Sequence, residues 1–271
     1  MVLTLLRLPL AIVLLGAVGG VAFGFPLLVA LLFAAIILPT DPAAVLSIFE
    51  ELDVAERLAV TIEGESLLND GVAVVIFTTL LAAFESSSAA ASLATLAGLA
   101  GMAVDVAVVG GGGLALGSAV GYLAHAETHH KMSTSEYHVQ EVWITAGFLV
   151  TTVLYVLIGA EVRASAFLQH FDLVVAAAVL VVLVRAATIY PLVTATNLVG
   201  GRPVPTCCQH VMVWGGLHTV VPVALVLSLP GTFSFREELQ VMVFGVAVLS
   251  LVVQGLLMRA VLSRLGMGEA G

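Results

Sequence analysis

Charged residues are scarce in this sequence. Asp, Glu, Lys and Arg together make up only 10% of its 271 residues, and Lys131 is the single lysine. Soluble domains carry roughly 25% charged residues, so this chain has too little polar surface to cover a water-soluble fold. The remaining charges are mainly acidic, with a formal net charge of −9, which argues against nucleic acid or an anionic lipid surface as a partner.

Cysteine is nearly absent. The two cysteines, Cys207 and Cys208, are adjacent in the sequence, and a disulfide between neighbouring residues is strained. We therefore expect no disulfide framework, and the cysteines do not define a redox compartment.

Long apolar stretches dominate what is present. Hydrophobic residues make up 61% of the chain and the mean hydropathy is +1.16. About 20 apolar residues are enough to cross a bilayer as a helix, so the pattern predicts an all-α membrane protein with about eight transmembrane helices. The fourth stretch carries consecutive glycines, which leaves open a tilted linker helix or an unwound segment. The eight stretches are 8–24, 26–49, 58–83, 91–124, 142–162, 172–199, 206–229 and 238–260.

The basic residues predict the orientation of these spans, because cytoplasmic loops carry an excess of Lys and Arg. We therefore expect a multi-pass protein of the cell membrane with both termini in the cytoplasm. One side of the membrane collects Arg7, Arg57, Lys131, Arg202 and Arg264, and the other collects Arg163 and Arg236.

The polar loop at 125–141 contains four histidines. These histidines form either a metal site or part of a plain solvated loop, and their irregular spacing favours the plain loop.

An aspartate between two prolines interrupts the second stretch, in the segment Leu-Pro-Thr-Asp-Pro at 38–42. Pro42 disfavours helix at Asp41, and both prolines remove backbone donors, so we expect a broken helix whose ends face a polar cavity. Discontinuous helices near the midplane hold ions in many secondary transporters. The alternative is a structural kink in which Asp41 caps a half-helix, which does not exclude an ion-binding role.

Four oxygen-bearing side chains share one helical face of the third stretch: Glu65, Ser66, Asn69 and Asp70. A charged group inside a span costs roughly 3 kcal/mol or more, so each one is a functional candidate. Carboxylate, hydroxyl and carbonyl oxygens suit a hard monovalent cation that is partly stripped of water. Two carboxylates this close do not both stay charged without a cation, so the face predicts a site at which a proton and a cation compete.

Arg185 and His218 are the other polar candidates within spans. An arginine in the middle of the sixth stretch needs a carboxylate partner, and we expect Glu65 to form this structural ion pair. The segment Trp-Gly-Gly-Leu-His-Thr at 214–219, followed by Pro222, predicts a second broken helix. His218 is either a gating or proton-carrying group or a packed, hydrogen-bonded histidine.

The two expected breaks fall in two groups of three spans. We expect a first core triplet at 1–83 with a break near Asp41, and a second at 163–271 with a break near His218. Residues 84–162 would supply a linker helix, the polar cytoplasmic loop and one scaffold helix. By the predicted orientation the triplets are inverted relative to each other, which is the architecture expected of an alternating-access carrier.

These segments resemble the NhaP-type sodium/proton antiporters, the branch of the monovalent cation:proton antiporters that includes the eukaryotic sodium/hydrogen exchangers. The resemblance implies a secondary active transporter, not an enzyme, which exchanges a monovalent cation, above all sodium, for protons. It implies no cofactor besides the transported ions, and a homodimer or a partner subunit. The matching segments are Leu-Pro-Thr-Asp-Pro at 38–42, Glu-Gly-Glu-Ser-Leu-Leu-Asn-Asp-Gly at 63–71, Val-Arg-Ala at 184–186 and Trp-Gly-Gly-Leu at 214–217.

The resemblance also implies roles for individual residues. Asp70 is the principal carboxylate for ion and proton, and Asn69 beside it resembles the Asn-Asp signature of the electroneutral branch. Ser66 and the backbone of Thr40 complete the ion shell, so that Asp70, Ser66 and Thr40 hold the metal ion. Asp41 supports the site.

The chain departs from the family in length and at His218. It resembles the family from the fourth span onward and lacks two spans before its own fifth, so we expect a truncated version with little scaffold and dimerisation domain. The family usually carries arginine where this chain has His218. A non-transporting fragment, or half of a split antiporter, is therefore the alternative. An intramembrane hydrolase built on Ser66 is disfavoured, because a Gly-x-Ser-x-Gly turn is missing.

Overall fold

A computed structural model describes residues 2–52, 56–86, 95–128, 164–199 and 203–267, together with scattered positions between 145 and 160. The described residues form helices and connecting turns, and their only β-type pairing is one isolated bridge. Within these residues, four helices are long and apolar enough to cross a membrane by length and composition. The part of the chain that is described is therefore all-α, as predicted.

The first half of the core consists of one continuous helix, one broken helix and a second continuous helix. They are α1 (Val2–Phe23), the pair α2 (Leu27–Ile37) and α3 (Ala43–Glu51), and α4 (Glu56–Glu85). Gly24, with a φ of 71°, ends α1 in the left-handed conformation that glycine adopts without strain.

The second half of the core repeats this order. It contains α9 (Phe171–Val199), the broken pair α10 (Thr206–Trp214) and α11 (Val220–Leu227), and a last long helix. That last helix is α12 (Arg236–Leu249), continued by the π-helical turn η1 (Ser250–Gly255) and by α13 (Leu256–Arg264). The short helix α8 (Ala164–Gln169) precedes α9.

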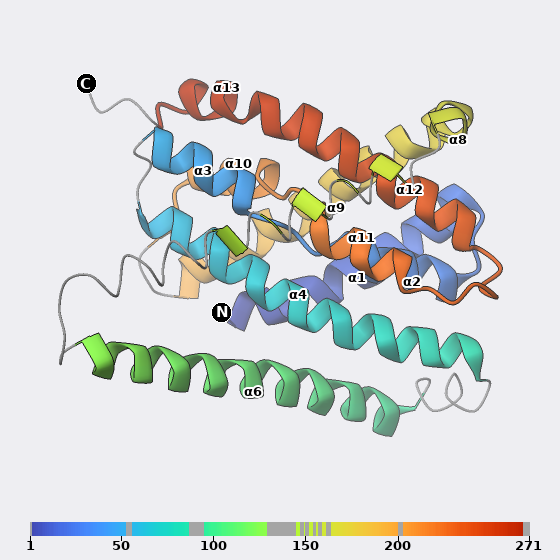
Figure 1. The fold of residues 1–271 in the computed structure, drawn as a ribbon, viewed down its shortest axis with the longest axis horizontal. Coiled ribbons are helices and arrows are strands. Elements are labelled where there is room, and N and C mark those ends of the chain that lie inside the picture. Colours follow the sequence, from blue (N-terminus) through green and yellow to red (C-terminus); the bar gives the residue numbers. More distant parts are fainter. Residues whose placement is uncertain are drawn as a thin grey trace.

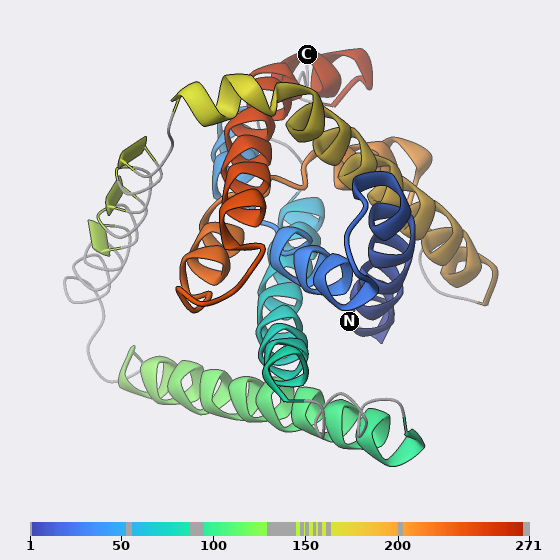
Figure 2. The ribbon, with the colours of Figure 1, turned by 90° about the vertical axis from the view of Figure 1, so that its right-hand side faces the viewer.

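Helix α6 (Leu96–Thr128) lies at the periphery of the molecule. Figure 1 shows it running along the outer side of α4, and Figure 2 shows it set apart from the rest of the bundle. It is helical throughout, including the glycines at 110–113, so the alternative of an unwound segment there is wrong, and the role of a linker stays a prediction. Asp105 on this helix is exposed.

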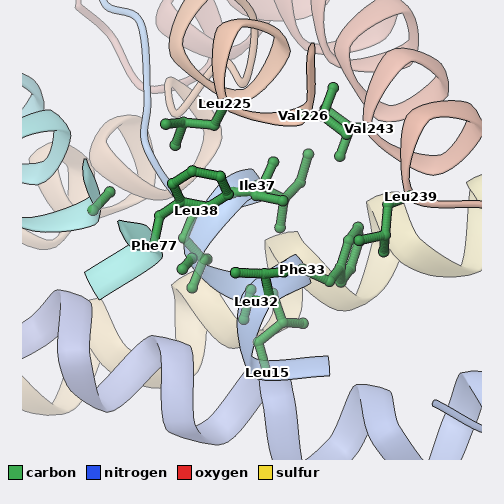
Figure 3. Packing of buried hydrophobic residues seen from close by; sticks show 14 of the residues in the cluster. Leu15, Leu32, Phe33, Ile37, Leu38, Phe77, Leu225, Val226, Leu239 and Val243 are labelled. Carbon is green, nitrogen blue, oxygen red and sulfur yellow. The ribbon is translucent and has the colours of Figure 1, made fainter. Parts of the chain in front are cut away.

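A shared apolar cluster joins the two halves of the core. Leu15 of α1, Phe33 of α2 and Phe77 of α4 pack in one cluster with Val226 of α11 and Val243 of α12. Figure 3 shows these side chains converging from helices that are far apart in the sequence. Between helices in a bilayer, such van der Waals packing replaces the hydrophobic effect as the main source of cohesion.

Glycine permits close approach of neighbouring helices within each half of the core. A Cβ on Gly245 of α12 would lie 2.5 Å from the Cγ1 atom of Val174 on α9. Gly16 of α1 is crowded in the same way by Leu31 of α2. Small residues at such positions let transmembrane helices pack with their backbones close together.

The structure corrects one sequence prediction. Arg7 was predicted to lie outside the first span, among the basic residues of cytoplasmic loops. It instead lies inside α1 and is 5% exposed, so it does not count toward the orientation of the chain. Arg7 can be buried there because Glu65 supplies an acidic partner, with 2.7 Å between Nη2 of Arg7 and Oε1 of Glu65.

Several predicted features fall wholly or mainly outside the described residues. They are the polar loop at 125–141 beyond Thr128 and most of the span predicted at 142–162. The predicted division into 1–83, 84–162 and 163–271 stays a prediction.

Candidate functional site

The two helix breaks cross each other in the interior of the protein. The first break separates α2 from α3 at 38–42, and the second separates α10 from α11 at 215–219. The backbone N–H of Asp41 donates a hydrogen bond of 2.7 Å to the carbonyl oxygen of Leu217, which is the isolated antiparallel bridge of the structure. Both breaks were predicted from proline and glycine, and their contact satisfies backbone groups that would otherwise be unpaired inside a membrane.

Asp41 is held by both broken helices. Its Oδ1 atom accepts a hydrogen bond of 3.0 Å from the N–H of Ala43 in the first turn of α3. Its Oδ2 atom accepts one of 2.8 Å from the hydroxyl of Thr219, the residue that precedes α11. The carboxylate therefore lies where two helix N-termini favour negative charge. The capping role that the sequence left as an alternative is thus observed, and it occupies both oxygens of Asp41.

Ser66 joins α4 to the first break. Its hydroxyl donates to the carbonyl oxygen of Thr40, and it also lies 2.8 Å from the hydroxyl of Thr40. Both residues are buried, with exposed fractions of 3%. Two hydroxyls and one main-chain carbonyl thus lie together at the surface of α4 that faces the break.

Asn69 and Asp70 lie one turn further along the same helix. Asn69 is fully buried, and neither atom of its side-chain amide has a hydrogen-bond partner among the described residues. The buried Oδ1 atom of Asp70 likewise has no partner in the described part of the chain. The carboxylate of Asp70 is also within electrostatic reach of that of Asp41. Polar atoms buried without partners are costly, so this arrangement fits groups that bind a cation or a proton.

Glu65 lies between two arginines. The Nη2 atom of Arg185 on α9 donates to the Oε1 atom of Glu65 over 3.1 Å, as the sequence predicted for this pair. The Nη2 atom of Arg7 on α1 lies 2.7 Å from the same oxygen. All three residues are at most 5% exposed. The sequence analysis missed Arg7, although a lone arginine beside an apolar run was a signal that it needed a partner.

Arg185 also braces the second broken helix. Its Nε atom donates a hydrogen bond of 2.9 Å to the carbonyl oxygen of Met212, near the end of α10. The guanidinium packs directly over Gly216, where there is no room for a Cβ. The ion pair therefore connects α4 and α9 with the break between α10 and α11.

His218 is a buried, hydrogen-bonded residue at the crossing. Its Nδ1 atom lies 3.0 Å from the carbonyl oxygen of Pro39, and its backbone N–H donates to the hydroxyl of Ser250 over 3.1 Å. A carbonyl only accepts, so Nδ1 carries the hydrogen. This supports the packed histidine of the two alternatives, because the side chain ties one break to the other. A gating or proton-carrying role for it stays a prediction.

The π-helical turn η1 was not predicted. Gln254 within it donates from Nε2 to the carbonyl oxygen of Trp214, and the indole N–H of Trp214 donates to the carbonyl oxygen of Gln254. These bonds, 3.0 and 3.1 Å long, satisfy the C-terminal end of α10. The hydroxyl of Ser250, the first residue of η1, accepts a hydrogen bond from the backbone N–H of His218 in the second break. π-helical turns are frequent at functional sites, and this one turns two polar side chains toward the crossing.

The arrangement suits oxygen ligation of a small hard cation. Its donors are the carboxylate of Asp70, the hydroxyl of Ser66 and the carbonyl oxygen of Thr40, beside the amide of Asn69. Within the residues described, no group of three or more His, Cys, Asp and Glu side chains forms a transition-metal site. The histidines predicted as an alternative metal site lie outside the described residues or have side chains that are not described.

Comparison with known proteins identifies similar chains. A family model described as "Sodium/hydrogen exchanger, transmembrane" matches residues 1–131 and 122–264. The chain is 32% identical to the Na(+)/H(+) antiporter ApNhaP of Aphanothece halophytica over 90% of its own length and 55% of that protein. It is 29% identical to the Na(+)/H(+) antiporter NhaG of Bacillus atrophaeus over 89% of its own length and 53% of that protein. The chain thus spans about half the length of these relatives.

A solved structure has a similar fold. The sodium proton antiporter MjNhaP1 from Methanocaldococcus jannaschii superposes with a TM-score of 0.63, over 97% of this chain and 78% of that one. The two sequences are 16% identical, so this likeness concerns the fold.

Proposed function

This chain belongs to the sodium/hydrogen exchanger family, and on that premise we propose that it exchanges a monovalent cation, preferentially sodium, for protons by alternating access. It is a multi-pass membrane protein of a transporter family. The named activity of its relatives, sodium/proton antiport, becomes a proposal here because the chain spans about half of their length.

The observation that carries the proposal is the contrast between the two aspartates. Both oxygens of Asp41 already accept hydrogen bonds, from Ala43 and from Thr219. The Oδ1 atom of Asp70 is buried without any such partner among the described residues. A buried carboxylate oxygen without a donor is stable when it binds a cation or carries a proton. Asp70 is therefore the group that exchanges them, and Asp41 supports the site.

The contacts of Ser66 and Thr40 support their inclusion among the proposed ligands. Ser66 is four residues before Asp70 on α4, which places the two side chains on the same face of the helix. The hydroxyl of Ser66 contacts Thr40, so ion ligands from α4 and from the first break meet there. We propose that Asp70, Ser66 and the carbonyl oxygen of Thr40 hold the sodium ion, with Asn69 beside them.

During alternating access, the helices of the core would move about the point where the two helix breaks cross. Asp70 would be protonated in one half of the cycle and cation-bound in the other, and the core would open to opposite sides of the membrane. The ion pair of Glu65 with Arg185 would keep the two halves of the core together during this movement. We further propose the cell membrane as the location, both termini in the cytoplasm, and a homodimer or a partner subunit that supplies scaffold spans.

Proton movement in proteoliposomes tests this function. Purified protein is reconstituted with a pH-sensitive dye inside, and sodium is added outside after an acid interior has been established. We expect the lumen to become more alkaline on adding sodium. Asp70→Asn should abolish the response, and Asp105→Asn, which changes an exposed carboxylate on α6, should preserve it. A folded protein that gives no response at any pH would contradict the proposal.

A further inference from the structure

Arg7 is a second buried, positively charged side chain that contacts Glu65. One guanidinium, that of Arg185, is enough to pair with this carboxylate, and it donates to Oε1 with good geometry. Arg7 adds another, whose Nη2 atom lies 2.7 Å from the same oxygen as an ion pair, although neither its Nε nor its Nη2 atom makes a well-formed hydrogen bond within the described residues. Burying an additional arginine is costly, so a purely structural ion pair does not account for Arg7.

We propose that Arg7 sets the net charge of the buried site and thereby makes it select a monovalent over a divalent cation. The inference rests on the proposed function and assigns Arg7 a specificity role in it. Arg7 lies on α1 and contacts Glu65, and it acts on the bound ion through the field of its charge.

Counting the ionised groups around the site shows what Arg7 does. The carboxylates of Asp41, Asp70 and Glu65 bring three negative charges, and the guanidiniums of Arg7 and Arg185 bring two positive ones. The described site thus carries one net negative charge, which a single monovalent ion neutralises. Without Arg7 it would carry two, which is the charge that a divalent ion neutralises.

His218 does not alter this count. Its Nδ1–H already donates to the carbonyl oxygen of Pro39, and its Nε2 atom has no partner among the described residues. A charged imidazolium would leave a buried N–H at Nε2 without an acceptor, which is costly, so we count the ring as neutral. Among the described residues, Glu63 of α4 and Asp105 of α6 are exposed, and Glu51 of α3 pairs with Arg259 at the surface.

The expected size of the effect follows from Coulomb's law. Glu65 lies about one turn from Asn69 and Asp70 on α4, so Arg7 is on the order of 10 Å from the bound ion. At that separation, and with an effective dielectric constant of about 20, one unit charge changes the affinity for a monovalent ion by roughly tenfold. The change for a divalent ion is the square of that, roughly a hundredfold.

Sodium and calcium binding to the purified full-length chain tests the inference. Affinity is measured from the rise in melting temperature with each ion separately, since a ligand that binds only the folded state stabilises it by mass action. Arg7→Gln should raise the sodium affinity about tenfold and the calcium affinity about a hundredfold, so that the preference for sodium falls about tenfold. This variant should fold, because Glu65 keeps Arg185 as its partner.

Two further variants separate charge from structure. Arg7→Lys keeps the charge but not the guanidinium, and it should keep the wild-type ion preference. The double variant Arg7→Gln with Glu65→Gln restores the net charge and should restore the preference. An unchanged preference in Arg7→Gln, or an equal loss in Arg7→Lys, would overturn the role of Arg7 while leaving the antiporter proposal intact. A wild type that binds no sodium would instead overturn the proposed function and this inference with it.

Discussion

The backbone N–H of Asp41 lies 2.7 Å from the carbonyl oxygen of Leu217, and this bond fastens the two broken helices to each other at their crossing. The bond is formed by main-chain atoms, so no single side-chain substitution removes it directly. The side chains around it decide whether the crossing keeps its shape, and each gives a prediction.

Gly216→Ala should displace the buried ion pair. An added Cβ would collide with the guanidinium of Arg185, which cannot move without losing Glu65 or the carbonyl oxygen of Met212. Overpacking of this kind costs about 1–3 kcal/mol of stability. Gly64→Ala is the matched control, because a Cβ there meets no atom within 4 Å and alanine favours helix. Thermal unfolding in detergent should show a lower melting temperature for the Gly216 variant alone.

Thr219→Val should remove one of the hydrogen bonds that hold the carboxylate of Asp41 and lower the stability of the protein. The substitution keeps the shape of the side chain but removes the hydroxyl that donates to Oδ2 of Asp41 over 2.8 Å. A hydrogen bond to a charged group contributes about 1.5–3 kcal/mol, so the melting temperature should fall. Thr196→Val removes a hydroxyl that bonds only to carbonyls of its own helix, Leu192 and Val193, and should cost far less. Equal losses in the two variants would show that the hydroxyl of Thr219 does not stabilise the carboxylate of Asp41.

Glu65→Ala should be among the most destabilising substitutions in the chain. It leaves both Arg7 and Arg185 buried without a carboxylate, and breaking a buried pair from one side costs about 3–5 kcal/mol. The exposed pair of Glu51 with Arg259 offers a comparison, since surface pairs contribute about 0–1 kcal/mol. Glu51→Ala should therefore unfold at nearly the wild-type temperature. A small effect of Glu65→Ala would show that the cluster does not hold the helices together.

Ser66→Ala should weaken sodium binding. The variant loses one proposed ligand and the contact with Thr40, while the carboxylate of Asp70 remains. We expect about a tenfold lower sodium affinity, equivalent to about 1.4 kcal/mol, in calorimetric titrations of purified protein. Thr78→Val removes a hydroxyl elsewhere on α4, bonded to the carbonyls of Val74 and Val75, and should leave the affinity unchanged. Unaltered binding by Ser66→Ala would remove it from the ligand set.

The positions of the helix breaks were predictable because proline and glycine act on the backbone locally. Pro39 and Pro42 stand on either side of Thr40 and Asp41 and disfavour helix between them, and the glycine pair at 215–216 marks the second break. The ion pair of Glu65 with Arg185 was predictable for another reason: a buried charge requires an opposite charge. The contacts that residues of one break make with residues of the other break were not predictable, since they depend on how helices far apart in the sequence cross.

Arg7 and η1 show where sequence reasoning failed. Arg7 stands at the edge of an apolar stretch, and the rule for basic residues in loops treats such a position as interfacial. Its burial depends on Glu65 of another helix, which sequence spacing does not reveal. The π-helical turn at Ser250–Gly255 inserts a residue into the helical register, and no residue type in that segment predicts such a turn.

The central claim is that sodium and a proton compete for the carboxylate of Asp70, and proton release on sodium binding tests it most directly. Purified protein in weakly buffered detergent solution is titrated with sodium while the pH is recorded, with choline as the inert control ion. The account predicts that sodium releases protons from the wild type, and that Asp70→Asn, with its fold confirmed by thermal unfolding, releases none. Proton release that persists in Asp70→Asn, or sodium binding to the wild type without release at any pH, would contradict it.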